Sequence, residues 1–221
     1  MNAAAKRIEL WVRKRLPNSV RHALRLGKHL LTRGGPSLSL PPELIDGCQV
    51  CASRYELVKL LPRGRVAEIG TNQGDFAKHI LAHCDPTELH LVDIEFSLFD
   101  AAIGDDERVT LHKGLSHEVL ASFPDASFDW IYIDADHSAA AVARDARAAA
   151  DKVKPGGFLV FNDFAHMDHQ LGTYGVHRAV VEFAVQERWR FVWLAYDPFA
   201  LYDVALQRVQ PLSAEGAPGS L

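Results

Sequence analysis

From residue 65 onward, short apolar runs alternate with longer amphipathic segments, and this order restricts the fold more than any other feature of the sequence. The apolar runs have the length of buried strands, and the segments between them have the apolar spacing of helices. Strands that alternate with helices form a parallel sheet with right-handed crossovers. The expected strands are residues 65–70, 88–94, 108–112, 128–134, 157–163, 190–196 and 201–209, and the expected helices are residues 43–60, 73–82, 137–153 and 175–188.

The last two expected strands are joined by a turn at Asp197-Pro198, which is too short for a crossover. The last strand should therefore run antiparallel to its neighbour. We predict an α/β chain with a single doubly wound, Rossmann-like sheet of seven strands, the last strand antiparallel, and an N-terminal helical extension. A chain of 221 residues can bury such a core without disulfides.

Residues 1–33 are strongly basic, although the whole chain has a net charge of −4. They carry nine Lys and Arg residues and a single acid, Glu9, and apolar residues recur among them at intervals of three or four. This pattern indicates a basic amphipathic helical arm. We divide the chain into this arm with its linker (1–42), a main domain (43–209) and a flexible tail rich in Gly, Pro, Ser and Ala (210–221).

Two kinds of partner suit the arm. Packing on the acidic main domain or on a second subunit, which would give a homodimer, is favoured because amphipathic helices are commoner in packing than on membranes. The alternative is peripheral contact of residues 1–33 with an anionic membrane surface. We expect no nucleic acid partner, since no recognition motif follows the basic segment.

The three cysteines are too few for a disulfide framework. No apolar run reaches the roughly 18 residues of a membrane span, and the N-terminal charges do not precede the apolar run of a signal peptide. We therefore expect a cytoplasmic protein, placed at the inner membrane surface if the arm binds membranes. Cys48 and Cys51 form a C-x-x-C within predicted helix 43–60, which we interpret as two small apolar residues on one helix face rather than a zinc or redox site.

A carboxylate, Glu68, ends the first expected strand, and a glycine turn from Gly70 to Gly74 opens the next helix. The pattern E-x-G-x-x-x-G lacks the middle glycine of the dinucleotide fingerprint. A carboxylate in the crevice would repel a pyrophosphate and attract a cation, so we expect S-adenosylmethionine, a positively charged nucleoside without phosphate. Asp93 ends the second strand, where an acidic residue accepts ribose hydroxyls, and Leu115-Ser116 after the third strand should border the adenine.

Three further blocks follow in order: I-D-A-D-H-S at residues 133–138, and the segments 153–164 and 175–183. With the glycine turn, they make residues 66–209 resemble the class I S-adenosylmethionine-dependent methyltransferases, and among these the small bacterial methyltransferases that share an I-D-x-D-H-S block. The main domain is therefore expected to be a methyltransferase domain. The resemblance implies a cofactor site made of Glu68, Gly70, Thr71, Asn72 and Gly74 at the methionine end, Asp93 at the ribose, Leu115 and Ser116 at the adenine, and Asp134. Asn72 departs from the glycine common at that position.

Oxygen-bearing side chains end the two strands that should be neighbours at the centre of the sheet. Asp134 ends the fourth strand, and Asn162-Asp163 end the fifth. Because the carboxyl ends of parallel strands meet at one edge, these side chains should converge, and Mg²⁺ prefers such ligands. The catechol and caffeoyl-CoA O-methyltransferases, which this block also resembles, place a metal with a similar set. Asp134, Asn162 and Asp163 are thus the expected metal ligands.

His137 stands where the caffeoyl-CoA enzymes have the lysine of a D-A-D-K block. We therefore expect His137 to be the general base that removes the proton of an acceptor hydroxyl, with Mg²⁺ lowering the pKa of that hydroxyl. His166, on the loop after the fifth strand, is the second candidate for the base. The alternative reading of the same residues is structural, with Asp134 and Asp163 as helix caps and His137 as an N-terminal helix residue.

The predicted function is O-methylation of a hydroxyl group on a small molecule or saccharide. Two alternatives stay open, an N-methyltransferase and a non-catalytic or membrane-tethered interaction protein that binds S-adenosylmethionine. A nicotinamide-dependent dehydrogenase is set aside, because its Y-x-x-x-K spacing, found here at Tyr55 and Lys59, precedes the first strand instead of following the central ones.

Overall fold

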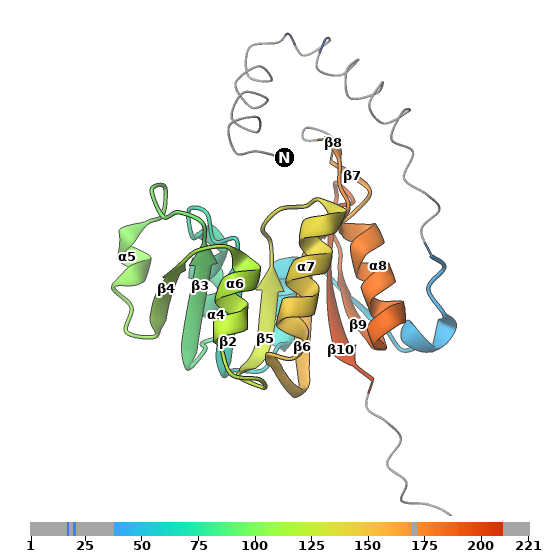
Figure 1. Ribbon diagram of the computed structural model, residues 1–221, viewed down its shortest axis with the longest axis horizontal. Coiled ribbons are helices and arrows are strands. Elements are labelled where there is room, and N and C mark those ends of the chain that lie inside the picture. The colour runs from blue at the N-terminus through green and yellow to red at the C-terminus, as the bar shows by residue number, and fades with distance from the viewer. Residues whose placement is uncertain (1–16, 18–19, 21–37, 169–171, 210–221) are drawn as a thin grey trace, which may run out of the picture.

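The computed structural model describes residues 17, 20, 38–168 and 172–209 (Figure 1). Its centre is a mixed sheet of eight strands in the order β1-β9-β10-β6-β5-β2-β3-β4. The strands are β1 Gln49–Cys51, β2 Arg65–Ile69, β3 Glu88–Asp93, β4 Val109–Lys113, β5 Phe128–Ile133, β6 Val153–Phe164, β9 Trp189–Ala195 and β10 Tyr202–Arg208. A separate hairpin pairs β7 Met167–Asp168 with β8 Gly172–Thr173.

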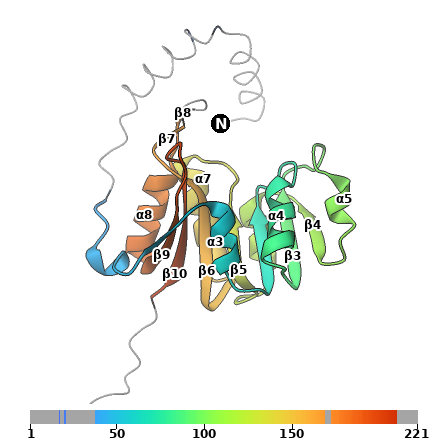
Figure 2. The same ribbon diagram turned by 180° about the vertical axis from the view of Figure 1, so that it is seen from behind.

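Helices cover both faces of this sheet. Helices α6, α7 and α8 lie on one face (Figure 1), and α3 and α4 lie on the other (Figure 2). The helical elements are η1 Pro42–Leu44, α3 Arg54–Leu60, α4 Asp75–His83, α5 Ala101–Gly104, α6 Ser116–Ser122, α7 Ala139–Ala150 and α8 Val176–Glu187. None of the helices in the described part of the chain is long and apolar enough to cross a membrane.

The α/β doubly wound architecture is confirmed, including the antiparallel course of β10 against both β6 and β9. The expected count of seven strands is wrong, because β1 forms an eighth strand beside β9. The N-terminal helical extension and the tail at 210–221 fall almost entirely outside the described residues, so both stay predictions.

The expected helix over residues 43–60 is confirmed only at Arg54–Leu60, which form α3, and is wrong before them. A turn at Asp46-Gly47 separates η1 from β1, and Ser53 then caps α3 by accepting a hydrogen bond from the backbone nitrogen of Glu56. Pairing with β9 overrides the helical spacing of this segment. Cys51 accordingly ends a strand rather than sharing a helix face with Cys48.

Two hydrophobic clusters fill the space between the sheet and its helices. Successive residues of a strand point to opposite faces, so Ala67 and Ile69 pack toward α7 and α8, whereas Val66 packs toward α3 and α4. The same alternation places Tyr132 on the α3 face, beneath Phe76 of α4, with their ring centroids 4.3 Å apart. Glu68 lies two residues after Val66, so its side chain is on the same face of the sheet, where it forms part of the site described below.

A pair of histidines, the buried His90 and the half-buried His112, links β3 to β4. Nδ1 of His90 lies 2.9 Å from Nε2 of His112, and Nε of Arg65 lies 3.0 Å from Nε2 of His90. Oε2 of Glu88 lies 3.2 Å from the same Nε2 of His90 and 3.0 Å from Nε of Arg65. Burial is the main cause that lowers the pKa of His90. Burial is also the main cause that lowers the pKa of His112, and electrostatic interaction with His90 lowers it further.

This pair should make the fold sensitive to acid. The pKa values are lowered only in the folded state, so their stability contribution is complete above the unfolded value of about 6.5 and is lost as the pH falls through the folded values. We expect the free energy of unfolding in urea to fall from about pH 7 to about pH 5, with a smaller slope in His90→Gln. The control His83→Gln, at an exposed histidine, should keep the full slope. Equal slopes in wild type and His90→Gln would contradict the assignment.

Candidate functional site

The turn between β2 and α4 lies at the carboxyl edge of the sheet. Gly70 has a φ of +91°, and its amide nitrogen donates to the carbonyl oxygen of Val92, 2.8 Å away. A side chain at Gly70 would overlap the backbone oxygen of Asp134. Backbone conformation and close approach therefore both require glycine. The turn is held against the ends of β3 and β5, in the crevice where open α/β sheets bind ligands.

Asn72 and Asp93 fix the shape of this turn. Asn72 has a φ of +50°, and its backbone nitrogen donates to Oδ2 of Asp93 over 2.8 Å. Asparagine tolerates the left-handed region better than most residues, which accounts for a residue other than glycine at this position. Oδ1 of Asp93 also accepts from the backbone nitrogen of Glu95 at 3.3 Å. Asp93 is thus held at the end of β3.

Two polar groups at the end of β2 are buried without a hydrogen-bond partner among the described residues. These are Oε2 of Glu68 and Oγ1 of Thr71. Burial, followed by the negative charge of Asp134, raises the pKa of Glu68 well above its ordinary value, against the opposing effect of Arg54. A buried polar atom without a partner is costly, so this pair of oxygens is suited to a ligand that brings donors.

The expected adenine edge is formed by two residues with different surroundings. The side chain of Leu115 is exposed, as is compatible with contact to a bound ligand. The hydroxyl of Ser116 donates to Oδ1 of the buried Asp145 over 2.7 Å and so ties α6 to α7. Contact of either residue with a nucleoside stays a prediction.

The three expected metal ligands surround the imidazole of His137. Nε2 of His137 lies 3.2 Å from Oδ1 of Asn162, 3.5 Å from Oδ1 of Asp134 and 3.5 Å from Oδ2 of Asp163. Burial, followed by the carboxylates of Asp163 and Asp203, raises the pKa of Asp134 well above its ordinary range. The structure therefore brings the expected base and the expected ligands into one cluster.

The cluster does not fit a bound metal ion as it stands. Mg²⁺ binds oxygen at about 2.1 Å and keeps several waters, whereas the imidazole occupies the point on which the three side chains converge. Within residues 38–168 and 172–209, no group of three or more His, Cys, Asp or Glu side chains is arranged to hold a metal. Magnesium stays a prediction, and no step of the mechanism below depends on it.

The position of His137 is fixed by the loop before α8. The ring of Tyr174 stacks on His137 with centroids 4.6 Å apart and planes inclined by 19°. The backbone nitrogen of Gly175 donates to the carbonyl oxygen of His137 over 2.8 Å. His166, the other candidate base, is exposed, and its ring lies 4.0 Å from that of His177 on α8. Of the two candidates, His137 is the one held among acidic groups.

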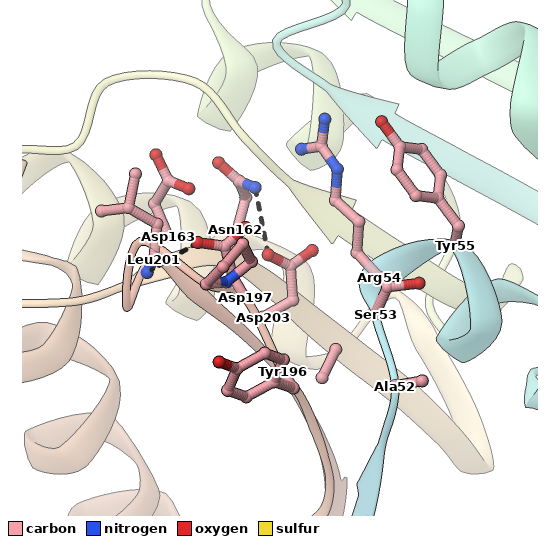
Figure 3. Close-up of a pocket in the computed structure, with 12 residues that line it drawn as sticks. Ala52, Ser53, Arg54, Tyr55, Asn162, Asp163, Tyr196, Asp197, Leu201 and Asp203 are labelled. Carbon is pink, nitrogen blue, oxygen red and sulfur yellow. Dashed lines mark hydrogen bonds between the residues drawn. The ribbon is translucent and has the colours of Figure 1, made fainter.

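A pocket of about 380 Å³ opens beside this cluster (Figure 3). It lies between the start of α3 and the turn that joins β9 to β10. Asn162 and Asp163, which contact His137, form part of its wall. The lining residues are Ala52, Ser53, Arg54, Tyr55, Asn162, Asp163, Ala195, Tyr196, Asp197, Pro198, Leu201 and Asp203.

Asp203 is a functional candidate that the sequence did not reveal. Its Oδ2 accepts a 2.5 Å hydrogen bond from the hydroxyl of Tyr132, and its Oδ1 accepts from Nδ2 of Asn162 at 3.2 Å. Burial raises the pKa of Asp203 to about 7, although the bond from Tyr132 and the charge of Arg54 lower it. A lone Asp in an apolar strand carries no motif, and only the pairing of β10 with β6 shows its proximity to Asn162.

Arg54 is the second residue that sequence reasoning missed. Its guanidinium lies over the rings of Tyr55 and Phe76, 5.3 Å and 5.0 Å from their centroids. Its charge lowers the pKa values of Glu68, Asp134 and Asp203, yet no carboxylate of the described residues lies within ion-pair distance of it. The guanidinium is therefore available to an anionic group of a bound ligand (Figure 3).

Comparison with known proteins agrees with the fold described above. Residues 67–164 match the family model of a methyltransferase domain. A Corynebacterium glutamicum protein is 15% identical with a TM-score of 0.56, over 95% of this chain and 99% of that one. An S-adenosylmethionine-dependent methyltransferase from Mesorhizobium loti is 16% identical with a TM-score of 0.54, over 71% of this chain and 98% of that one.

Fibrillarin from Aeropyrum pernix, whose structure contains natively bound S-adenosyl-L-methionine, is 15% identical with a TM-score of 0.54. The match covers 69% of this chain and 73% of fibrillarin. At these identities the structural likeness shows the fold. Comparison with curated protein sequences gives no match.

Proposed function

We propose that this chain is a class I S-adenosylmethionine-dependent methyltransferase, as the similarity of residues 67–164 to a methyltransferase domain supports, and that it transfers a methyl group to a hydroxyl oxygen of a small molecule or saccharide. The observation that carries the proposal is the placement of His137. Its imidazole is held among Asp134, Asn162 and Asp163, beside a pocket open to an acceptor. A histidine in this position suits proton removal from a hydroxyl group.

The cofactor is assigned to the edge formed by β2 and β3. When bound, it supplies a methyl group on a positively charged sulfonium. Glu68 offers its unpartnered Oε2 to the ammonium of the methionine moiety, and Thr71 offers its hydroxyl. Asp93 keeps oxygen lone pairs for the ribose hydroxyls, since a carboxylate accepts about four hydrogen bonds and two are used.

His137 would take the proton of the acceptor hydroxyl as that oxygen forms its bond to the methyl carbon and the bond from that carbon to the cofactor sulfur breaks, which leaves a neutral thioether. The ring acquires a positive charge in this step, and the carboxylate of Asp163, 3.5 Å from Nε2, stabilises that charge. Tyr174 keeps the ring in its plane by stacking. Holding acceptor and base in fixed geometry contributes much of the rate acceleration in such reactions.

The pocket favours a small polar acceptor. Its volume of about 380 Å³ lies in the range of small-molecule sites. Tyr55 and Tyr196 contribute aromatic rings, and Asn162 and Asp163 contribute oxygens that can accept from hydroxyl groups. A monosaccharide unit or a phenol-sized molecule matches this combination of ring faces and acceptors.

Calorimetric titration with S-adenosylhomocysteine, in Mg²⁺ and again in EDTA, tests the proposal. We expect micromolar binding in both buffers, lost in Asp93→Ala, and turnover in an acceptor screen of sugars and phenols. Turnover that requires Mg²⁺ would show that the cluster rearranges to bind the ion. Binding of S-adenosylhomocysteine without methylation of any hydroxyl group would contradict the O-methyltransferase. Methylation of amines would then support an N-methyltransferase, and no methylation at all would support a non-catalytic interaction protein.

Glu68 should couple cofactor binding to pH. Because burial raises the pKa of Glu68, its carboxyl keeps a proton above the ordinary range, and an ammonium group binds the ionised form. We expect the affinity for S-adenosylhomocysteine to rise with pH above the ordinary range of a glutamate, with release of a proton on binding. Calorimetry in two buffers of different ionisation enthalpy measures that proton. Glu68→Gln should bind more weakly and release none; equal release from both proteins would assign the proton elsewhere.

We also propose a cytoplasmic location, with residues 1–33 as the segment that makes a homodimer or contacts a membrane. Removal of residues 1–33 separates the two roles. A change from dimer to monomer in sedimentation supports assembly. Loss of liposome binding at an unchanged sedimentation coefficient supports the membrane.

A further inference from the structure

Arg54, the first residue of α3, has its guanidinium held by aromatic rings rather than by acids. Its Cζ atom lies 5.3 Å from the ring centroid of Tyr55 and 5.0 Å from that of Phe76. The hydroxyl of Tyr55 can accept one of its protons, but a ring face offers no lone pair. Most of the five N–H donors of the guanidinium are therefore left for a ligand.

Arg54 stands between the cofactor edge and the pocket. On the cofactor side, burial and the charge of Asp134 raise the pKa of Glu68, and Arg54 is the cation whose charge opposes them. On the other side, Arg54 is the only positively charged residue among the described residues that line the pocket. Figure 3 shows it across the pocket from Asp163. The guanidinium thus borders both places where a ligand is expected.

Two acids of the pocket are satisfied without this cation. Asp203 accepts from the hydroxyl of Tyr132 over 2.5 Å and from Nδ2 of Asn162 over 3.2 Å. Asp197 accepts from two backbone nitrogens of its own turn, 2.8 Å and 3.3 Å away. Arg54 is half-buried, and a cation removed from water without an ion-pair partner costs free energy. A carboxylate that binds to a guanidinium removes that cost and gains two charge-assisted hydrogen bonds.

We propose that Arg54 is the residue that binds a carboxylate of a ligand in this site, an inference that rests on the proposed function. Two ligands can bring this group. The first is the cofactor, because the carboxylate and the ammonium of its methionine end stand on one carbon, and Glu68 is assigned to the ammonium. The second is an acceptor that is itself an acid, such as a sugar acid or a phenolic acid.

A pair of cofactor products tests the first source in the full-length protein. S-adenosylhomocysteine and its decarboxylated form share the adenosine, the thioether and the ammonium, and differ in the carboxylate. If the cofactor brings the group, calorimetry should show a preference for S-adenosylhomocysteine of about 10- to 100-fold, the usual effect of hydrogen bonds to a charged group. Arg54→Gln should bind both ligands with nearly equal affinity. Loss of the charge acts on Glu68 in the same way for both ligands, so the ratio reports the carboxylate contact alone.

Acids and their neutral counterparts test the second source. Glucuronate with glucose, and dihydroxybenzoate with catechol, are titrated into protein saturated with S-adenosylhomocysteine. If the acceptor brings the carboxylate, the wild-type protein should bind the acids about 10- to 100-fold more tightly than the neutral molecules. Arg54→Gln should lose this preference and keep the wild-type ratio in the first titration.

Two further variants complete the experiment. Arg54→Lys keeps the charge without the planar fork, so it should retain part of the preference, and it carries the test if Arg54→Gln fails to fold. Lys59→Gln is the matched control, because it removes an exposed cation of the same helix that pairs with Glu56. It should keep both wild-type ratios.

The outcomes separate this inference from the proposed function. A wild-type protein without a preference for the carboxylate in either titration, or an Arg54→Gln variant with unchanged ratios in both, would overturn the role of Arg54 while S-adenosylhomocysteine still binds. No binding of S-adenosylhomocysteine by the wild-type protein would refute the cofactor, and with it the proposed function and the inference that rests on it.

Discussion

Replacement of His137 by Gln is expected to lower kcat by about 10²- to 10⁴-fold, the usual contribution of a general base. Glutamine keeps a polar side chain of similar length but cannot take up a proton at neutral pH. The affinity for S-adenosylhomocysteine should be unchanged, because Glu68, Asp93 and the glycine turn are separate from the imidazole. Methyl transfer to the acceptor identified in the screen, measured as S-adenosylhomocysteine formed, gives kcat and KM separately.

His166→Gln is the matched control for this prediction. It removes the second candidate base, whose ring packs against His177 rather than among the acidic groups. We expect its kcat to stay within a few-fold of wild type. If His137→Gln remained active and His166→Gln did not, the base would be His166, and the cluster around His137 would have a structural role.

The strands from residue 65 onward could be predicted from the sequence because each depends mainly on the polarity of its own residues. Each expected strand from residue 65 onward is a short apolar run, and its residues alternate between two buried faces, as Val66 and Ala67 do. The antiparallel β10 followed from the length of one turn. By contrast, β1 exists only through pairing with β9 far along the chain, and the helical spacing of its sequence pointed to the wrong element.

The same distinction separates the site residues that were predicted from those that were missed. Glu68, Asp93, Asp134 and His137 stand at strand ends within recognisable motifs, so topology alone gathers them at one edge. Asp203 reaches the cluster because β10 pairs antiparallel with β6, where it lies in a register shift between Tyr202 and Val204 that cannot be read from spacing. Arg54 begins α3, directly after the segment that was wrongly expected to be helical, and its place over Phe76 needs the packing of α3 on α4.

One face of the sheet explains why these residues act together. Glu68, Tyr132, Asn162 and Asp203 share the strand face that packs toward α3, and each replaces an apolar residue at the point where its strand reaches the carboxyl edge. Burial raises the pKa values of Glu68, Tyr132 and Asp203. The apolar core beneath the site thus gives its polar side chains a low-dielectric environment. Hydrogen bonds among these side chains hold them in place.

Gly70→Ala is expected to abolish cofactor binding and to lower the free energy of unfolding by about 3 kcal/mol or more, which combines backbone strain of about 1–2 kcal/mol with overpacking of about 1–3 kcal/mol. The added methyl group would overlap the backbone of Asp134, so the turn must move away from β5.

Gly156→Ala is the matched control. Gly156 has a φ of +80°, but an added methyl group meets no atom within 4 Å. This control should lose only the strain term in urea denaturation and keep full affinity for S-adenosylhomocysteine in calorimetry. Equal losses of stability in the two variants would mean that the contact with Asp134 contributes nothing, and binding by a folded Gly70→Ala would move the cofactor away from this turn.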